Sequence, residues 1–168
     1  LTLILRSLPT MYARKLTTIL KSKLFLIITH PIVTALLNIG GLWLLYTTNL
    51  FSWMHMNEWV YWFVHFHVFV AGYLFTISII YIDPIYHRKS MRYRAVVLIV
   101  AIAGHSILAK YMYGNPPIGI STEQAERGSM LMYYGGDIID AILIFILCFQ
   151  WYKANRPKVR DEKGAMFQ

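Results

Sequence analysis

Charged residues and cysteine are both scarce in this 168-residue sequence. Lys, Arg, Asp and Glu together make up 14% of the residues, whereas hydrophobic residues make up 57% and aromatic residues 15%. A soluble domain usually carries about 25% charged residues, so this composition is typical of a membrane protein. The single cysteine, Cys148, excludes an internal disulfide framework and any metal site built from several thiolates. The sequence also lacks an HExxH pair and a recognisable Ser or Cys nucleophile motif, and we therefore expect no enzymatic activity.

Four apolar stretches are each long enough to cross a bilayer, which takes about 20 residues. They cover residues 24–46, 59–82, 93–113 and 131–152. Each is expected to be a continuous helix, because lipid cannot satisfy unpaired backbone groups, and Asp83 before Pro84 should end the second. We therefore predict an all-α, polytopic membrane protein in which four transmembrane helices form an up-down bundle. Residues 24–152 would be the transmembrane domain and 153–168 a basic cytoplasmic tail.

The first 23 residues alternate apolar and basic side chains. This pattern indicates a cytoplasmic or interfacial amphipathic segment, or the end of a preceding helix. The sequence starts at Leu1 rather than at a methionine, and no secretion signal follows. We therefore expect the natural chain to continue upstream.

Positive charge is distributed unevenly between the ends of the four stretches. All but two of the 16 Lys and Arg residues lie before the first stretch, between the second and third, or after the fourth; the exceptions are Lys110 and Arg127. Because positively charged loops stay on the cytoplasmic side, both termini and the 83–94 loop are expected to be cytoplasmic. The 47–58 and 114–130 loops would then be external. The net charge of +8 thus reflects topology, and we predict no binding to nucleic acid.

Ionisable side chains interrupt three of the apolar stretches, at His65, His67, His105, Asp137 and Asp140. At about 1.5 Å per residue they lie about 9 to 14 Å below the outer boundary, within a common layer. Such groups usually face a partner, a cavity or an ion rather than lipid. Asp137 and Asp140 share one helix face. His65 and His67 lie about 200° apart around their helix, so only one of them is expected to face a shared site.

Imidazole and carboxylate donors suit a divalent or copper ion, and thioethers favour Cu(I). Thioethers are plentiful on the expected external side, where Met54, His55 and Met56 form a triplet and where other methionines follow at Met112, Met130 and Met132. The sequence therefore predicts Cu(I) capture by the triplet.

From the triplet, copper would pass to His65 or His67 together with His105, while Asp137 orients an imidazole. Three simpler interpretations stay open. The methionines can fill apolar gaps, the histidines can be hydrogen-bonded packing residues, and the aspartates can pair with His105 or Lys110.

Four runs of the sequence resemble the CtaG-type cytochrome c oxidase assembly factors of bacteria. They are HFHVFVAGYLF at 65–75, IDPIYHR at 82–88, AGHSIL at 103–108, and LMYYGGD at 131–137 continuing to QWY at 150–152. The resemblance implies a multi-pass protein of the bacterial plasma membrane that matures a haem–copper oxidase of the caa3 kind. It also implies that copper is helped to reach the catalytic subunit, with an oxidase subunit and membrane lipid as partners. The chain would match the C-terminal portion of longer family members, and the resemblance favours His65, His67, His105 and Asp137 as the polar positions of interest.

Two other functions fit the same residues. A haem b held by His105 and by His65 or His67 would make the bundle an electron-transfer protein. A proton or ion pathway would use buried Asp and His as relays, although only His30 supplies an inner half.

Overall fold

The computed structural model describes residues 7–81 and 88–156. Throughout these residues the regular structure is helical, with no strand, so the all-α prediction is confirmed. In chain order the elements are α2 (Thr10–Leu20), α3 (Lys23–Ile28), α4 (Pro31–Ala35), the π-helical turn η1 (Leu36–Gly40), α5 (Gly41–Thr47), α6 (Leu50–Met56), α7 (Glu58–Ile79), α8 (Met91–Gly114) and α9 (Thr122–Asn155). The predicted stop at Asp83 and the 82–88 motif fall largely outside the described residues.

Polar caps start the long helices. The Asn57 side chain accepts hydrogen bonds from the first backbone amides of α7, and Ser90 and Ser121 do the same for α8 and α9. Each cap satisfies backbone donors that have no partner inside the helix. Pro31 opens α4 at its first position, where its missing amide proton costs nothing.

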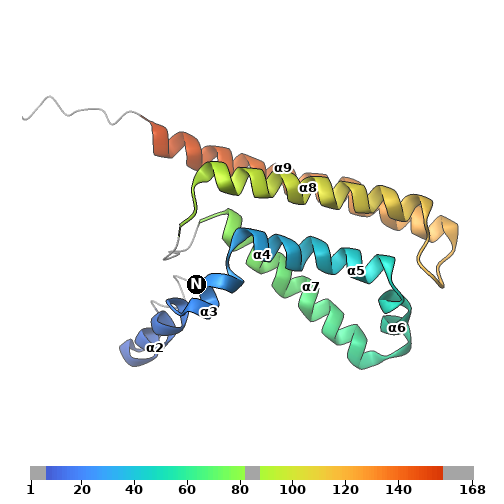
Figure 1. Ribbon diagram of the computed structural model, residues 1–168, viewed down its shortest axis with the longest axis horizontal. Coiled ribbons are helices and arrows are strands. Elements are labelled where there is room, and N and C mark those ends of the chain that lie inside the picture. The colour runs from blue at the N-terminus through green and yellow to red at the C-terminus, as the bar shows by residue number, and fades with distance from the viewer. Residues whose placement is uncertain (1–6, 82–87, 157–168) are drawn as a thin grey trace, which may run out of the picture.

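The helices form two layers, and within each layer neighbouring helices run antiparallel (Figure 1). In one layer α8 and α9 run side by side along their length, and in the other the continuous segment from α4 through α5 lies beside α7. Helix α6 turns the chain at one end of this second layer, while α2 and α3 lie at the opposite end, which is also the end at which α9 finishes. The loop between α8 and α9 lies at the α6 end of the molecule.

Three helices, α7, α8 and α9, are each long and apolar enough to cross a membrane. A fourth crossing results if the Pro31–Thr47 segment and α6, which are bent by 78° relative to each other, count as one broken span. The predicted continuous helix at 24–46 is therefore wrong in detail. Helix α3 ends at Ile28 and α4 begins only at Pro31, because the residue before a proline avoids helical geometry.

Two further boundaries differ from the sequence prediction. Residues 50–56, expected to be an external loop, form α6. Helix α9 begins at Thr122 rather than near residue 131, because Ser121 caps it and its first turns are polar rather than apolar. At about 1.5 Å per residue, its 34 residues are longer than a crossing of the roughly 30 Å hydrocarbon core of a bilayer requires.

The main apolar core joins α7, α8 and α9 near their expected cytoplasmic ends, with Phe75, Ile79, Leu98, Ala101 and Leu143 among its buried members. The buried guanidinium of Arg94 closes this end of the core. It donates to the Ile79 carbonyl and to Gln150, and it lies 3.9 Å from the centre of the Tyr81 ring. Arg94 thus ties three helices together through neutral partners.

Candidate functional site

His105 lies at the centre of the polar layer, on α8 and facing α9. Its imidazole Nε2 is 3.0 Å from the backbone carbonyl oxygen of Met132. The ring fits there because Gly136 has no side chain: a Cβ atom at that position would lie 2.5 Å from Nε2. The two helices therefore hold the imidazole in a notch.

The carbonyl partner decides which ring nitrogen of His105 carries a proton. A carbonyl oxygen can only accept, so Nε2 donates to Met132. In the neutral imidazole Nδ1 then keeps its lone pair and can accept a proton or bind a metal ion. Metal-binding histidines commonly have their second nitrogen fixed by a carbonyl or carboxylate in this way.

On one side, His105 lines an inner cavity of about 290 Å³ between α7, α8, α9 and η1. Asp140 contributes a carboxylate to the same cavity, and Asn38 and Thr76 contribute neutral polar groups. Phe75, Ala101 and Leu143 belong both to this lining and to the apolar core, so the cavity ends against well-packed residues.

The two aspartates lie close to His105 but in different surroundings. Asp140 is half-buried and interacts electrostatically with both His105 and Asp137. Asp137 is exposed on α9 and makes no hydrogen bond to a described residue. The α9 helix therefore presents one carboxylate to the cavity and a second toward its own outer surface.

On its other side, His105 lines an outer cavity of about 430 Å³. The thioether residues Met112 and Met132 line this cavity too, together with Phe51 of α6 and Pro117 of the loop between α8 and α9. That loop lies at the α6 end of the molecule (Figure 1). His105 is thus shared by a cavity with sulfur donors and a cavity with a carboxylate.

His67 and His65 lie elsewhere. The Nε2 atom of His67 donates to the carbonyl of Leu37, 3.2 Å away in η1, and Gly41 makes room for the ring because a Cβ there would lie 2.7 Å from Nε2. His65 is exposed, with its ring centre 4.0 Å from that of Tyr61 and its Nδ1 donating to the Tyr61 carbonyl. The α-helical angle between the two histidines accounts for their different directions.

The Met54-His55-Met56 triplet does not point at one centre. Met54 is buried against Leu45 and Val64 as part of a small apolar core. His55 donates to the Phe51 carbonyl, and Met56 is 75% exposed. The thioethers that line a cavity with an imidazole are instead Met112 and Met132.

Within residues 7–81 and 88–156, no three His, Cys, Asp or Glu side chains come together as a metal-binding group. Of the five ionisable residues in the polar layer, His105 and Asp140 line one cavity, and Asp137 lies beside Asp140. In the sequence, the glycines that position the two imidazoles are simply the second members of two Gly-Gly pairs, at 40–41 and 135–136. Only the fold shows that the second glycine of each pair faces a histidine.

A family model described as cytochrome c oxidase caa3 assembly factor matches residues 1–154 of the chain. Neither the curated proteins nor the solved structures contain a match to the chain.

Proposed function

Because the chain belongs to the family of caa3 cytochrome c oxidase assembly factors, we propose that it helps copper reach the catalytic subunit of a haem–copper oxidase at the outer face of the bacterial plasma membrane. In this proposal the chain is a multi-pass membrane protein without enzymatic activity, and both of its termini are cytoplasmic. The uneven distribution of Lys and Arg supports this orientation. The location of α2 and the C-terminal end of α9 at one end of the molecule is consistent with it (Figure 1).

The observation that supports copper transfer is the position of His105 between two cavities. Its outer cavity contains the thioethers of Met112 and Met132, and its inner cavity contains Asp140. Thioethers and imidazole are soft and intermediate donors that suit Cu(I), whereas a carboxylate suits harder cations. The donor set therefore fits copper as a cargo that enters through the outer cavity.

In this mechanism Met112 and Met132 receive Cu(I) from the external side, and His105 accepts it through Nδ1. The Met132 backbone carbonyl keeps the other ring nitrogen protonated, so that the imidazole does not turn away. Asp140 adds negative charge beside the imidazole, which stabilises a cation there because Coulomb interactions are strong in a poorly hydrated cavity. The low number of donors favours weak binding, as transfer to a partner requires.

Asp137 marks the face of α9 on which we place the oxidase subunit. An exposed carboxylate in a spanning helix is costly when lipid surrounds it. A partner helix that supplies a hydrogen-bond donor to Asp137 would remove this cost. Asp137 also lies close enough to Asp140 to interact with it, so the docked subunit would lie near the inner cavity.

A haem b site has less support from the geometry. His105 donates to Met132 on α9, whereas His67 donates to Leu37 on η1 and His65 packs on Tyr61 at the surface. None of the cavities described here is lined by two histidines.

The proposal is tested by measuring Cu(I) affinity of the purified chain in detergent, under anaerobic conditions, by competition with a chromogenic Cu(I) chelator. His105→Ala and a Met112→Leu/Met132→Leu double variant are compared with the wild type. His65→Ala is the matched control, because that imidazole also donates to a carbonyl but lines neither cavity. Oxidase copper content is then measured in cells that carry each variant.

We expect His105→Ala and the double methionine variant each to weaken Cu(I) binding at least about tenfold and to reduce oxidase copper content, and His65→Ala to do neither. Equal affinities in all four proteins, with normal oxidase copper content, would show that copper does not follow this route.

A further inference from the structure

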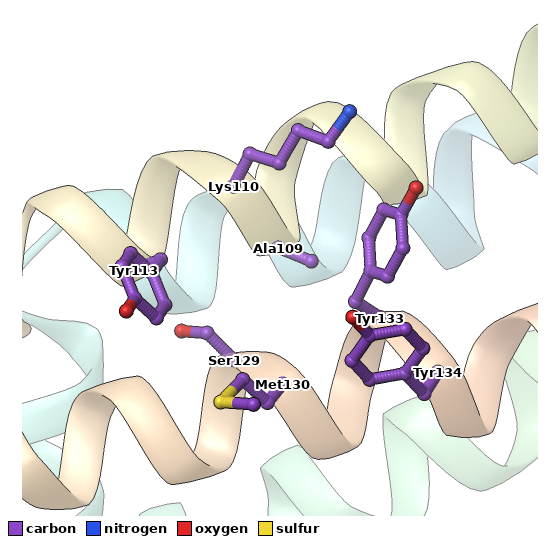
Figure 2. Close-up of a pocket in the computed structure, with 7 residues that line it drawn as sticks. All are labelled: Ala109, Lys110, Tyr113, Ser129, Met130, Tyr133 and Tyr134. Carbon is purple, nitrogen blue, oxygen red and sulfur yellow. The ribbon is translucent and has the colours of Figure 1, made fainter.

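A third cavity lies between α8 and α9, separate from the inner and outer cavities that His105 lines. It has a volume of about 420 Å³ and is lined by Ala109, Lys110, Tyr113, Ser129, Met130, Tyr133 and Tyr134. Figure 2 shows the Ser129 hydroxyl directed toward the Tyr113 phenol at one end, with Lys110 and Tyr133 at the other. Ala109, which is 1% exposed, lies between these two ends.

The hydroxyl of Ser129 is the most unusual group in this cavity. Ser129 is 2% exposed, yet its Oγ makes no hydrogen bond to a described residue. Serine hydroxyls within helices commonly bond to a carbonyl of the preceding turn, and an unpaired buried hydroxyl is unfavourable. Within the described part of the chain, the covered hydroxyl therefore lacks a partner that a bound ligand could supply.

Lys110 supplies the charge of the cavity. Apart from the tyrosine phenols, no other residue that lines this cavity has an ionisable side chain. Its Nζ lies 5.3 Å from the centre of the Tyr133 ring, and it forms no ion pair with a described residue. Neither Asp137 nor Asp140 lines this cavity. A lysine with no carboxylate partner, next to hydroxyl donors, favours an anion.

The depth of the cavity indicates where that anion comes from. Lys110 is four residues before the end of α8, or about 6 Å along the helix. Ser129 precedes the apolar part of α9 that starts near residue 131. Both positions therefore lie at the boundary between hydrocarbon and headgroups, where lipid phosphates are concentrated and where Tyr and Lys side chains commonly extend toward the headgroups.

We propose that this cavity binds the phosphate group of an anionic phospholipid. Lys110 provides the counter-charge, and the hydroxyls of Ser129 and Tyr113 donate hydrogen bonds to phosphate oxygens. Phosphate fits because it offers several acceptor oxygens to the hydroxyls at one end of the cavity and carries the negative charge that the lysine at the other end attracts. The acyl chains of the lipid would extend along the exposed apolar side chains of the α8–α9 pair, such as Ile107 and Ile138.

The experiment uses the full chain, freed of lipid in detergent, and native mass spectrometry to measure retention of added phosphatidylglycerol or phosphatidylcholine. Variants Lys110→Gln and Ser129→Ala are compared with the wild type. Lys153→Gln is the matched control, because Lys153 also lies over an aromatic ring, with its Nζ 4.6 Å from the centre of Phe149, but near the opposite end of α9. A second arm titrates each protein with inorganic phosphate and follows the phosphate by ³¹P NMR.

We expect the wild type to retain phosphatidylglycerol in preference to phosphatidylcholine. Lys110→Gln and Ser129→Ala should each weaken retention about tenfold, since each removes an interaction with a charged acceptor, and Lys153→Gln should match the wild type. Ser129→Ala should leave the thermal midpoint of the lipid-free protein unchanged or raised, because it removes an unpaired buried group.

The two arms separate the sources of the phosphate. Binding of inorganic phosphate with the same variant dependence, without retention of phosphatidylglycerol, supports a phosphate site that serves a soluble ligand. Equal behaviour of Lys110→Gln, Ser129→Ala and the wild type in both arms overturns the proposal.

Discussion

Replacing Gly136 with alanine tests whether the His105 imidazole occupies the notch between α8 and α9. An added Cβ would lie 2.5 Å from Nε2, 3.0 Å from Cδ2 and 3.4 Å from Cε1 of the ring. The first of these distances is too short for any carbon–nitrogen contact, so either the helices separate or the ring leaves. Forcing an extra methyl group into a packed interface costs about 1–3 kcal/mol.

Rotation of the ring is the alternative, and it costs the hydrogen bond from Nε2 to the Met132 carbonyl. A hydrogen bond of this kind contributes about 0.5–1.5 kcal/mol, and the Met132 carbonyl keeps its backbone hydrogen bond within α9. The two routes overlap in cost, so we expect Gly136→Ala to lower the free energy of unfolding by about 0.5–3 kcal/mol relative to a control.

Gly135→Ala is that control, because nothing lies within 4 Å of a Cβ at Gly135. Both substitutions gain the same helix propensity of about 1 kcal/mol, which cancels in the comparison. Unfolding is followed by far-UV circular dichroism in mixed detergent micelles, and ¹⁵N NMR of the histidine rings reports whether Nε2 keeps its hydrogen bond.

A double-mutant cycle with His105→Ala identifies the cause. In the His105→Ala background the cost of Gly136→Ala should disappear, since the clashing ring is gone. A cost that persists in that background, or a Gly136→Ala variant as stable as Gly135→Ala, would refute the notch.

Three further outcomes are expected from the helix contacts. Gly41→Ala should displace the His67 ring, whose Nε2 would lie 2.7 Å from the new Cβ, and lower stability by about 1–3 kcal/mol; the histidine ¹⁵N spectrum detects the displacement. Arg94→Met should destabilise the chain by about 2–4 kcal/mol in the same unfolding assay, because it leaves the Ile79 carbonyl and Gln150 without their charged donor. Thr34→Val should cost about 0.5–1.5 kcal/mol, because it removes the 2.7 Å hydrogen bond between the two buried hydroxyls and leaves Ser78 only the Phe75 carbonyl as a partner, whereas the double variant with Ser78→Ala should recover part of that loss.

Each of these outcomes has a result that contradicts it. An unchanged His67 signal in Gly41→Ala would show that the ring lies elsewhere. Full stability of Arg94→Met would mean that the core closes without the guanidinium. A double Thr34→Val/Ser78→Ala variant as unstable as the single one would show that packing, not hydrogen bonding, sets the cost.

Hydrophobicity and charge predicted the all-α class and the three long apolar helices α7, α8 and α9, because a span must be long and nearly free of charge. Helix α6 was missed because seven residues are too few to show a helical period. The break before Pro31 follows from a local steric rule, but the length and apolarity of residues 24–46 predicted one continuous helix. The early start of α9 depends on the Ser121 cap, which acts outside the apolar stretch.

The candidate site was predictable in depth but not in direction. Counting residues from the ends of the stretches placed His105 and Asp140 at similar levels, and they line one cavity. Depth says nothing of how a helix is rotated about its axis, and this rotation decides that His65 packs on Tyr61 while His67 reaches Leu37. The thioethers of Met112 and Met132 come together with His105 only through packing of α8, α9 and the loop between them.

The notches at Gly41 and Gly136 also restrict how neighbouring helices can move. Each accepts one imidazole at one residue position, and sliding either helix by one helical turn would bring a side chain against the ring. A piston-like shift of α8 along α9 is therefore blocked, as is one of α7 along α5. Any opening that releases a cargo past His105 must occur by lateral parting of the two layers, and the helices would then close again in the same alignment.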